Sequence, residues 1–269
     1  MKGSSEMEKT IELRLDTEEI KRMLTEKKDS EPKQNPHRKN VIELYAWCKE
    51  MLNGTHILIA GCSGSGKSVA INDLLYTAML ESPEKNLFCL IDLKRVELID
   101  YADAPHTVAY VDKPEQVERA LNGVLRVIDE RYDRMQAQRI KKSSEPTLWI
   151  VIDEYADLVC SCPKKVQTMI QRISQIGRAA NVKLLLATQR PTKEIIKGVT
   201  VVNLDTRLAL RTITAQDSRN IIQVNGAEAL PDYGYGIMQI KGRNRTIEIP
   251  LTEEEKINER VQYWINEWK

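Results

Sequence analysis

The chain has 269 residues, 42% of them hydrophobic and 29% charged, which suffices for one large folded domain with small appendages. Its 40 Lys and Arg residues nearly balance 39 Asp and Glu residues. This balance excludes a protein that binds nucleic acid through an overall positive charge, so any DNA contact must be a local patch. The five cysteines include no Cys-x-x-Cys pair, which fits a reducing cytosol. No apolar run approaches the roughly 20 residues of a membrane-spanning helix. We therefore expect a cytoplasmic chain without a membrane segment.

Residues 1–39 are expected to form an N-terminal appendage and a linker. Residues 11–15 alternate like a short strand, and Asp16 with Glu19 forms a capping box for a short helix. Residues 25–39, TEKKDSEPKQNPHRK, carry many charges and no apolar periodicity. They are expected to be a solvated linker, and a contact between their basic end and nucleic acid is the alternative.

Residues 40–250 are expected to form an α/β domain. A helix capped by Asn40 ends at a turn at Asn53 and Gly54, and strands and helices alternate from Thr55 onward. Because the strands are continuously apolar, this alternation favours a largely parallel twisted sheet with helices on both faces. The expected strands cover residues 56–60, 87–92, 107–111, 148–153, 182–187 and 207–211, with helices beginning at Lys67 and Pro114 and a further one around residues 166–176.

Two helices carry apolar residues at helical spacing, and these stripes are expected to lie in the core. They consist of Val117, Leu121, Val124, Ile128 and Tyr132 in one helix and of Val166, Met169, Ile170, Ile173 and Ile176 in the next. Near the end, residues 236–240 and 245–249 are expected to form a hairpin around residues 241–244. Thr252 and Glu255 are expected to cap an amphipathic helix within residues 251–269.

A phosphate-binding motif occupies residues 61–68, where GCSGSGKS matches G-x-x-x-x-G-K-[ST]. It follows the apolar strand HILIA and precedes the helix-compatible VAINDLLYTAML, which is the context that such a loop requires. Lys67 is expected to neutralise the β- and γ-phosphates of ATP, and Ser68 to offer its hydroxyl to Mg²⁺. The expected nucleotide-binding residues are Gly61, Cys62, Ser63, Gly64, Ser65, Gly66, Lys67, Ser68 and Val69.

Residues 148–154, LWIVIDE, form an apolar strand that ends in two adjacent carboxylates. Alone, such a strand could end at an exposed acidic turn, but after a phosphate-binding loop it has the form of a Walker B element. Asp153 is expected to hold Mg²⁺ through water, and Glu154 to orient and polarise the attacking water. The two motifs together predict a RecA-like P-loop ATPase that uses ATP and Mg²⁺.

The next strand ends in residues 187–191, ATQRP, which places polar side chains at the edge where open α/β sheets bind ligands. Gln189 is the candidate sensor that would contact the γ-phosphate or the attacking water. The alternative is an ordinary polar loop residue.

Five segments in order carry a resemblance to a known family. They are HILIAGCSGSGKSV, IDLKRVEL, VIDEYADL, RAANVKLLLATQRPT and QDSRNIIQVNGAEAL. Through them the chain from His56 to about Met238 resembles the FtsK/SpoIIIE family of DNA translocases. The resemblance implies a homo-hexameric ring around double-stranded DNA, with ATP sites between subunits and hydrolysis coupled to DNA movement.

The resemblance also implies roles for three arginines. Arg178 matches the residue that reaches the γ-phosphate held by a neighbouring subunit, whereas without the resemblance it reads equally as an arginine that complements a helix end. Arg190 and Arg219 fall in the segments that line the pore of the family's rings, and are therefore expected to contact DNA phosphates.

The chain also departs from the family pattern. Asp92 and Lys94 occupy a DPK-like position in which Leu93 replaces the proline, and residues 233–238, YGYGIM, lack the acidic residue of the family's GHGDM-like ending. Neither membrane spans nor a C-terminal winged-helix module is visible. This short form resembles motors of conjugative or integrative elements, plasmids or phages, which implies partner proteins of a DNA-transfer or mobile-element system.

Two other functions remain open at this point. Type VII secretion ATPases share the motor domain, although they usually have several motors in tandem and a membrane anchor. A nucleotide-gated adaptor would use the same ATP site to assemble a complex without processive movement.

Overall fold

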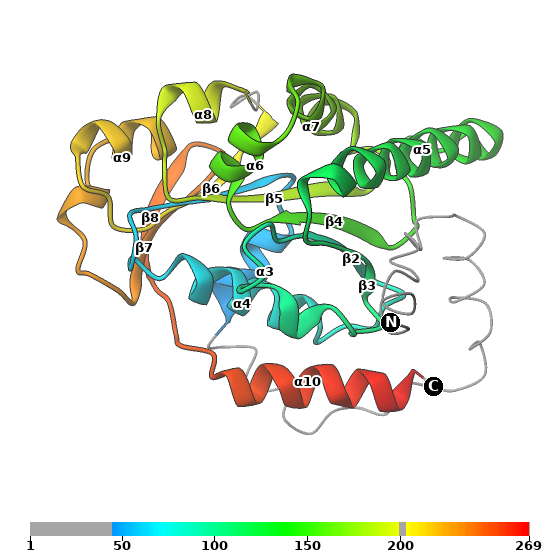
Figure 1. Ribbon diagram of the computed structural model, residues 1–269, viewed down its shortest axis with the longest axis horizontal. Helices are drawn as coiled ribbons and strands as arrows, with labels where there is room; N and C mark the ends of the chain where they lie inside the picture. Colours follow the sequence, from blue (N-terminus) through cyan, green and yellow to red (C-terminus); the bar gives the residue numbers. More distant parts are fainter. Residues whose placement is uncertain (1–44, 199–202, 269) are drawn as a thin grey trace, which may run out of the picture.

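The computed structural model describes residues 45–198 and 203–268 of the chain. The strand expected at residues 11–15, the short helix after it and the charged linker lie outside the described residues. From residue 45 onward, strands and helices alternate in the order that the sequence predicts (Figure 1).

The eight strands that the structure describes form one sheet in the order β3-β2-β4-β5-β1-β6-β7-β8. The first six of these run parallel, and β7 and β8 extend the sheet antiparallel at one edge. The prediction of a largely parallel sheet is confirmed. The strands are β1 (Ile57–Ala60), β2 (Asn86–Ile91), β3 (Thr107–Val111), β4 (Thr147–Ile152), β5 (Val182–Thr188), β6 (Thr206–Ala209), β7 (Tyr235–Ile240) and β8 (Arg243–Glu248).

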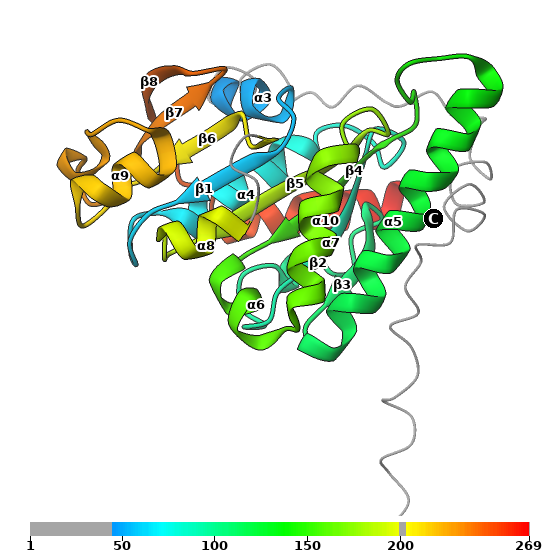
Figure 2. The same cartoon turned by 90° about the horizontal axis from the view of Figure 1, so that it is seen from above.

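Helices cover both faces of the sheet (Figure 1, Figure 2). Successive strand residues point to opposite faces, so Leu58 packs in the core beneath α5, α6, α7 and α9, and Ile59 packs in the core beneath α3, α4 and α10. None of the helices in the described ranges is long and apolar enough to cross a membrane. The helices are α3 (Ala46–Leu52), α4 (Lys67–Ala78), α5 (Pro114–Gln138), α6 (Tyr155–Ser161), α7 (Lys164–Ile176), α8 (Lys193–Gly198), α9 (Ala215–Ile222) and α10 (Glu254–Glu267).

The predicted apolar stripe of α5 is buried except at its last residue. Tyr132 is 37% exposed, so its prediction as a core residue is wrong. Its hydroxyl donates to the Ile176 carbonyl at 2.9 Å, where α7 ends, so the ring covers the end of that helix and keeps its polar tip near water. The other four residues of the stripe, Val117, Leu121, Val124 and Ile128, are buried.

The predicted hairpin forms between β7 and β8, but its turn has two residues rather than four. Lys241 and Gly242 both have positive φ, +50° and +77°, which is the backbone that a tight two-residue hairpin turn requires. Arg243 and Asn244, expected in the turn, belong to β8.

The predicted capping of α10 by Thr252 and Glu255 is wrong. Glu253 is the N-cap, and it makes no capping side-chain hydrogen bond. The buried Thr252 hydroxyl instead donates to the Asp73 carboxylate on α4 and accepts from the Tyr45 hydroxyl at 2.8 Å. A buried carboxylate without a donor costs more than an exposed helix N-terminus without a cap, which accounts for this arrangement.

Candidate nucleotide-binding site

The predicted phosphate-binding loop joins the C-terminal end of β1 to the N-terminus of α4. Gly64 and Gly66 have φ of +75° and +93°, a left-handed backbone that glycine adopts without strain. The backbone N–H of Cys62 donates to the Arg211 carbonyl at 2.8 Å and so ties the loop to the end of β6. The loop therefore leads into a helix N-terminus in the arrangement that binds phosphate groups.

Lys67 and Asp153 form a buried ion pair between α4 and the end of β4. The Lys67 ammonium lies 2.5 Å from Asp153 Oδ1 and 3.0 Å from the carbonyl oxygen of the same residue. Burial raises the pKa of Asp153, and the charge of Lys67 opposes that rise. Since an unpaired buried charge is costly, each group needs a replacement partner before it can leave the other.

Glu154 lies at the same edge and is bound by residues of the neighbouring strand. Thr188 Oγ1 donates to Glu154 Oε1 at 2.6 Å, and the Gln189 backbone N–H donates to Oε2 at 2.9 Å. Glu154 is also the N-cap of α6, where Oε1 accepts from the Ala156 N–H at 3.3 Å. Thr188 could not be assigned a role from the sequence, because no motif indicates that a threonine at the end of β5 faces a carboxylate at the end of β4.

A cavity of about 530 Å³ lies beside the phosphate-binding loop. The loop and Gln189 form its polar part, whereas Tyr233, Ile249 and Leu251 contribute an apolar part. Tyr233 and Leu251 are 71% and 69% exposed, so the described part of the chain leaves most of their surface uncovered. This apolar part was missed in the sequence analysis, because Leu251 stands in a connection without any recognisable motif.

The residues around this cavity fit a Mg²⁺-bound nucleoside triphosphate. Ser68 and Asp153 supply hydroxyl and carboxylate oxygens, the ligand types that Mg²⁺ prefers. Ser65 Oγ is buried without a hydrogen-bond partner in the described part of the chain. The loop itself lines the cavity with Cys62 and residues 64–69, so it is accessible to a ligand.

Asp92 and Lys94, at the DPK-like position, have separate partners. The Asp92 carboxylate is buried and accepts from the backbone N–H groups of Arg95, Glu97 and Leu98 at 2.9–3.1 Å, so it organises the loop after β2. Lys94 forms an ion pair of 3.2 Å with Asp157 on α6, three residues after Glu154.

Arg178 lies at the N-terminal ends of the parallel strands, whereas the phosphate-binding loop lies at their C-terminal ends. It stands in the turn between α7 and β5, and its side chain is exposed. Thr188, whose carbonyl accepts from the Gly61 N–H, is the last of the seven residues of β5, and six residue steps along the strand separate it from Val182, which follows this turn. At about 3.3 Å per residue, that separation is roughly 20 Å. The Arg178 side chain therefore cannot reach the loop of its own chain.

The two arginines predicted to contact DNA lie near one another at the C-terminal ends of the parallel strands, where the phosphate-binding loop also lies. Arg190 is exposed and follows β5, and Arg219 is exposed on α9. Their segments are joined by a hydrogen bond of 2.8 Å from Asn220 Nδ2 to the Pro191 carbonyl. Arg219 also donates to the side-chain oxygens of residues 216 and 225, which hold its guanidinium in place.

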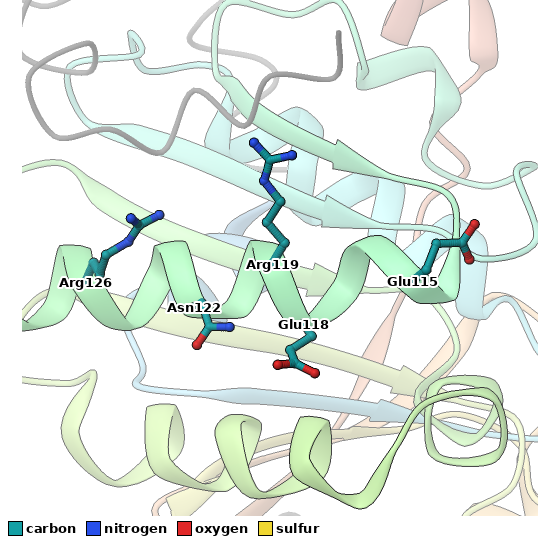
Figure 3. Close-up of a pocket in the computed structure, with 5 residues that line it drawn as sticks. All are labelled: Glu115, Glu118, Arg119, Asn122 and Arg126. Atoms are coloured by element: carbon teal, nitrogen blue, oxygen red, sulfur yellow. The ribbon is translucent and has the colours of Figure 1, made fainter. Parts of the chain in front are cut away.

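A second hollow lies along α5, and none of the predicted site residues lines it (Figure 3). Five polar residues of one helix line it: Glu115, Glu118, Arg119, Asn122 and Arg126. Arg119 and Arg126 point to one side of the helix and Glu118 to the other, where it pairs with Lys165 at 2.6 Å. These side chains do not converge on a common point, so the hollow is not a candidate active site.

Comparisons with solved structures support the fold. The chain is 26% identical to the cytoplasmic domain of the Thermomonospora curvata type VII secretion ATPase EccC, with a TM-score of 0.68 over 78% of this chain and 28% of that one. It is 20% identical to the pCW3 conjugation coupling protein TcpA, with a TM-score of 0.68 over 79% of this chain and 66% of that one, a likeness of fold alone.

Comparisons of sequence identify the family. The chain is 36% identical over 215 residues to the DNA translocase FtsK of Streptomyces avermitilis, which covers 71% of this chain and 24% of the relative. The chain spans about a quarter of the length of the curated relatives that it matches first. A sequence model of the FtsK/SpoIIIE family matches residues 20–147 and 138–193. The chain therefore belongs to the FtsK/SpoIIIE family, and its described part is a P-loop ATPase domain.

Proposed function

We propose that this chain is an ATP-driven motor that moves double-stranded DNA and works as a ring-shaped oligomer. The observation that carries the proposal is the convergence of Lys67, Asp153 and Glu154 beside an open phosphate-binding loop, in a chain whose relatives are named DNA translocases. A bound nucleotide without turnover would not need Glu154, since phosphate binding is the task of the loop and Lys67.

In this proposal each site residue has a distinct task. The loop and Lys67 bind the phosphates of ATP, Ser68 and Asp153 hold Mg²⁺, and Glu154 orients and polarises the attacking water. Mg²⁺ would neutralise the charge of the phosphates. The position of Gln189 on the wall of the cavity supports its assignment as the residue that senses the γ-phosphate.

The apolar part of the cavity fits the base of the nucleotide. Tyr233, Ile249 and Leu251 are close enough to the loop to line the same cavity, and an aromatic ring with two aliphatic side chains can sandwich a purine. Because ordinary nucleotide pockets combine apolar walls with few polar groups, this division supports a nucleoside triphosphate rather than a simple phosphate ion as the ligand.

The position of Arg178 supports an active site shared between subunits. Its guanidinium is exposed and makes no hydrogen bond or ion pair with the part of the chain that the structure describes. Placed against the phosphate-binding loop of a neighbouring subunit, it would stabilise negative charge that develops on the phosphoryl group.

Arg190 and Arg219 supply a local cationic patch in a chain whose formal net charge is only +1. Repeated around a ring, two exposed guanidinium groups per subunit would contact phosphates of a duplex without reading its sequence. We therefore assign DNA binding to the segment after β5 together with α9.

The test is the rate of ATP hydrolysis by the full chain with and without linear duplex DNA, measured alongside its mass in solution. We expect Mg²⁺-dependent hydrolysis that duplex DNA increases, ATP binding without turnover in Glu154→Gln, and loss of nucleotide binding in Lys67→Ala. Asp129→Asn, an exposed carboxylate on α5, is the matched control. Unchanged turnover in Glu154→Gln contradicts the catalytic assignment, and hydrolysis indifferent to duplex DNA contradicts the DNA assignment.

A protein-secretion ATPase is the second candidate, favoured by the 26% identity to EccC. Hydrolysis that duplex DNA leaves unchanged, together with an oligomer that fails to bind duplex at low salt, would favour this candidate. Slow hydrolysis that is limited to the assembly of an oligomer would favour the nucleotide-gated adaptor.

A further inference from the structure

Both carboxylate oxygens of Glu154 are bound by two consecutive residues, Thr188, which ends β5, and Gln189, which follows it. Thr188 donates its hydroxyl proton to Oε1 at 2.6 Å, and the Gln189 N–H donates to Oε2 at 2.9 Å. Thr188 is 1% exposed and Glu154 7%, so water does not compete freely for either bond. The short distance to an ionised acceptor is typical of a strong, charge-assisted hydrogen bond.

These bonds limit what Glu154 can do. A carboxylate offers about four lone-pair sites, and Thr188, Gln189 and the Ala156 N–H occupy three of them. The bonds also fix the direction of the carboxylate along the edge of β5. A residue that must turn toward an attacking water has to give up at least part of this arrangement.

We propose that Thr188 is a positioning residue that restrains Glu154 and releases it when the segment of residues 188–190 shifts. The inference rests on the proposed function, because it takes Glu154 as the residue that polarises the attacking water. Thr188 itself does not touch the substrate in this proposal; it acts only through the carboxylate of Glu154.

The same hydroxyl connects Glu154 to the proposed DNA contact. Thr188 Oγ1 accepts from the Arg190 backbone N–H at 3.1 Å, so one oxygen joins the carboxylate to the backbone of Arg190. Pro191 follows directly and accepts from Asn220, the neighbour of Arg219 on α9. A phosphate that pulls on Arg190 or Arg219 therefore acts on the segment that holds Glu154. The restraint couples DNA binding to the catalytic carboxylate.

The first test compares Thr188→Val, which removes the hydroxyl and keeps the shape, with Thr188→Ser, which keeps the hydroxyl. Without DNA, the turnover of Thr188→Val should rise on the order of tenfold to a hundredfold, the scale set by loss of one hydrogen bond to a charged group. Its stimulation by duplex DNA should fall by the same factor, since part of the release has already occurred. Thr188→Ser should retain the turnover and the stimulation of the parent.

The second test reads the contact without turnover, by amide hydrogen exchange of peptides that cover residues 186–192. Thr188→Val should exchange faster there than the parent, because the Arg190 N–H has lost its acceptor, and Thr188→Ser should exchange like the parent. Duplex DNA added to the parent should also accelerate exchange in this segment.

Equal or lower DNA-independent turnover in Thr188→Val overturns the restraint, and so does exchange indistinguishable from the parent. If duplex DNA neither stimulates the parent nor changes its exchange, the DNA part of the proposed function fails. In that case the DNA-independent comparison of Thr188→Val with the parent still decides whether Thr188 restrains Glu154.

Discussion

Replacing Asp73 by Asn should remove a pH dependence of stability that the burial of this carboxyl group creates. Asp73 lies on α4, the helix that follows the phosphate-binding loop, and it is fully buried. Thr252 donates to one carboxyl oxygen, whereas Oδ2 has no partner within the described ranges. Burial is the main cause that raises the pKa of Asp73 to about 7, and the hydrogen bonds from Thr252 only partly oppose it.

The direction of the effect follows from the difference between the folded and unfolded states. The pKa of Asp73 is 3.8 before the shift and about 7 in the fold, so between these values the folded state binds a proton that the unfolded state has lost. Stability from this group is therefore fully present below pH ~4 and is lost as the pH rises through ~7. One pH unit corresponds to ~1.4 kcal/mol, so from pH 5 to pH 8 the loss is on the order of 2 to 3 kcal/mol.

The measurement is the free energy of unfolding by urea at pH 5 to 8, for the parent and for Asp73→Asn. The informative quantity is the difference in the free energy of unfolding between the two proteins. Burial lowers the pKa of His56 and of His106 to about 4, so these histidines make the stability of both proteins rise with pH over the lower part of this range. Asp129→Asn, on the exposed side of α5, is the control and should run parallel to the parent. If the difference between parent and Asp73→Asn stays constant across this range, the buried, protonated form of Asp73 is refuted.

Three further outcomes are expected. Arg178→Ala should lose turnover and keep its affinity for nucleotide. Mixing this variant with Lys67→Ala subunits should restore part of the activity. Mixtures that exchange subunits without any recovery of activity would contradict a shared site. Arg190→Ala should weaken duplex binding across unrelated sequences, and the slope of log affinity against log salt concentration should fall by up to about 1. Arg126→Ala, on α5, is the control and should bind like the parent. Equal salt dependence in all three proteins would remove Arg190 from the DNA contact. Leu251→Ser should weaken ATP binding on the order of fivefold to tenfold, as loss of one apolar contact predicts, and leave the binding of tripolyphosphate unchanged. A parallel loss of affinity for both ligands would show that Leu251 does not contact the base.

Much of the fold could be predicted because the relevant signals are local. Continuous apolar strands separated by amphipathic helices indicate a parallel sheet covered on both faces, whatever the details of packing. The phosphate-binding loop is equally local, since its glycines, Lys67 and the N-terminus of α4 are consecutive in sequence. Asp153 could be assigned because its strand reads as a Walker B element beside that loop.

What the sequence did not reveal depends on contacts between distant residues. Thr188 meets Glu154 across 34 positions, and Thr252 meets Asp73 across 179. Thr252 has the local signature of a helix cap, but its hydroxyl accepts from Tyr45 and donates to the buried carboxylate of Asp73 instead of accepting from a backbone N–H of α10. Tyr132 has the spacing of a core residue, but periodicity shows only which face of α5 is apolar and not where its neighbour α7 ends.

The two ends of β5 constrain how copies of this chain would have to assemble. Arg178 stands before the strand and Thr188 ends it beside the phosphate-binding loop, so the two halves of the proposed active site lie about 20 Å apart on opposite edges of one sheet. A shared site then joins the Arg178 edge of one copy to the loop edge of the next, which is a head-to-tail contact. Such contacts are heterologous, and they close into a ring when the rotation between copies divides a full turn. In such a ring the segment of residues 188–190 would lie near each shared site. A shift of that segment when DNA binds would then reach Glu154 in the copy that carries it and the Arg178 end of the neighbour that completes its site.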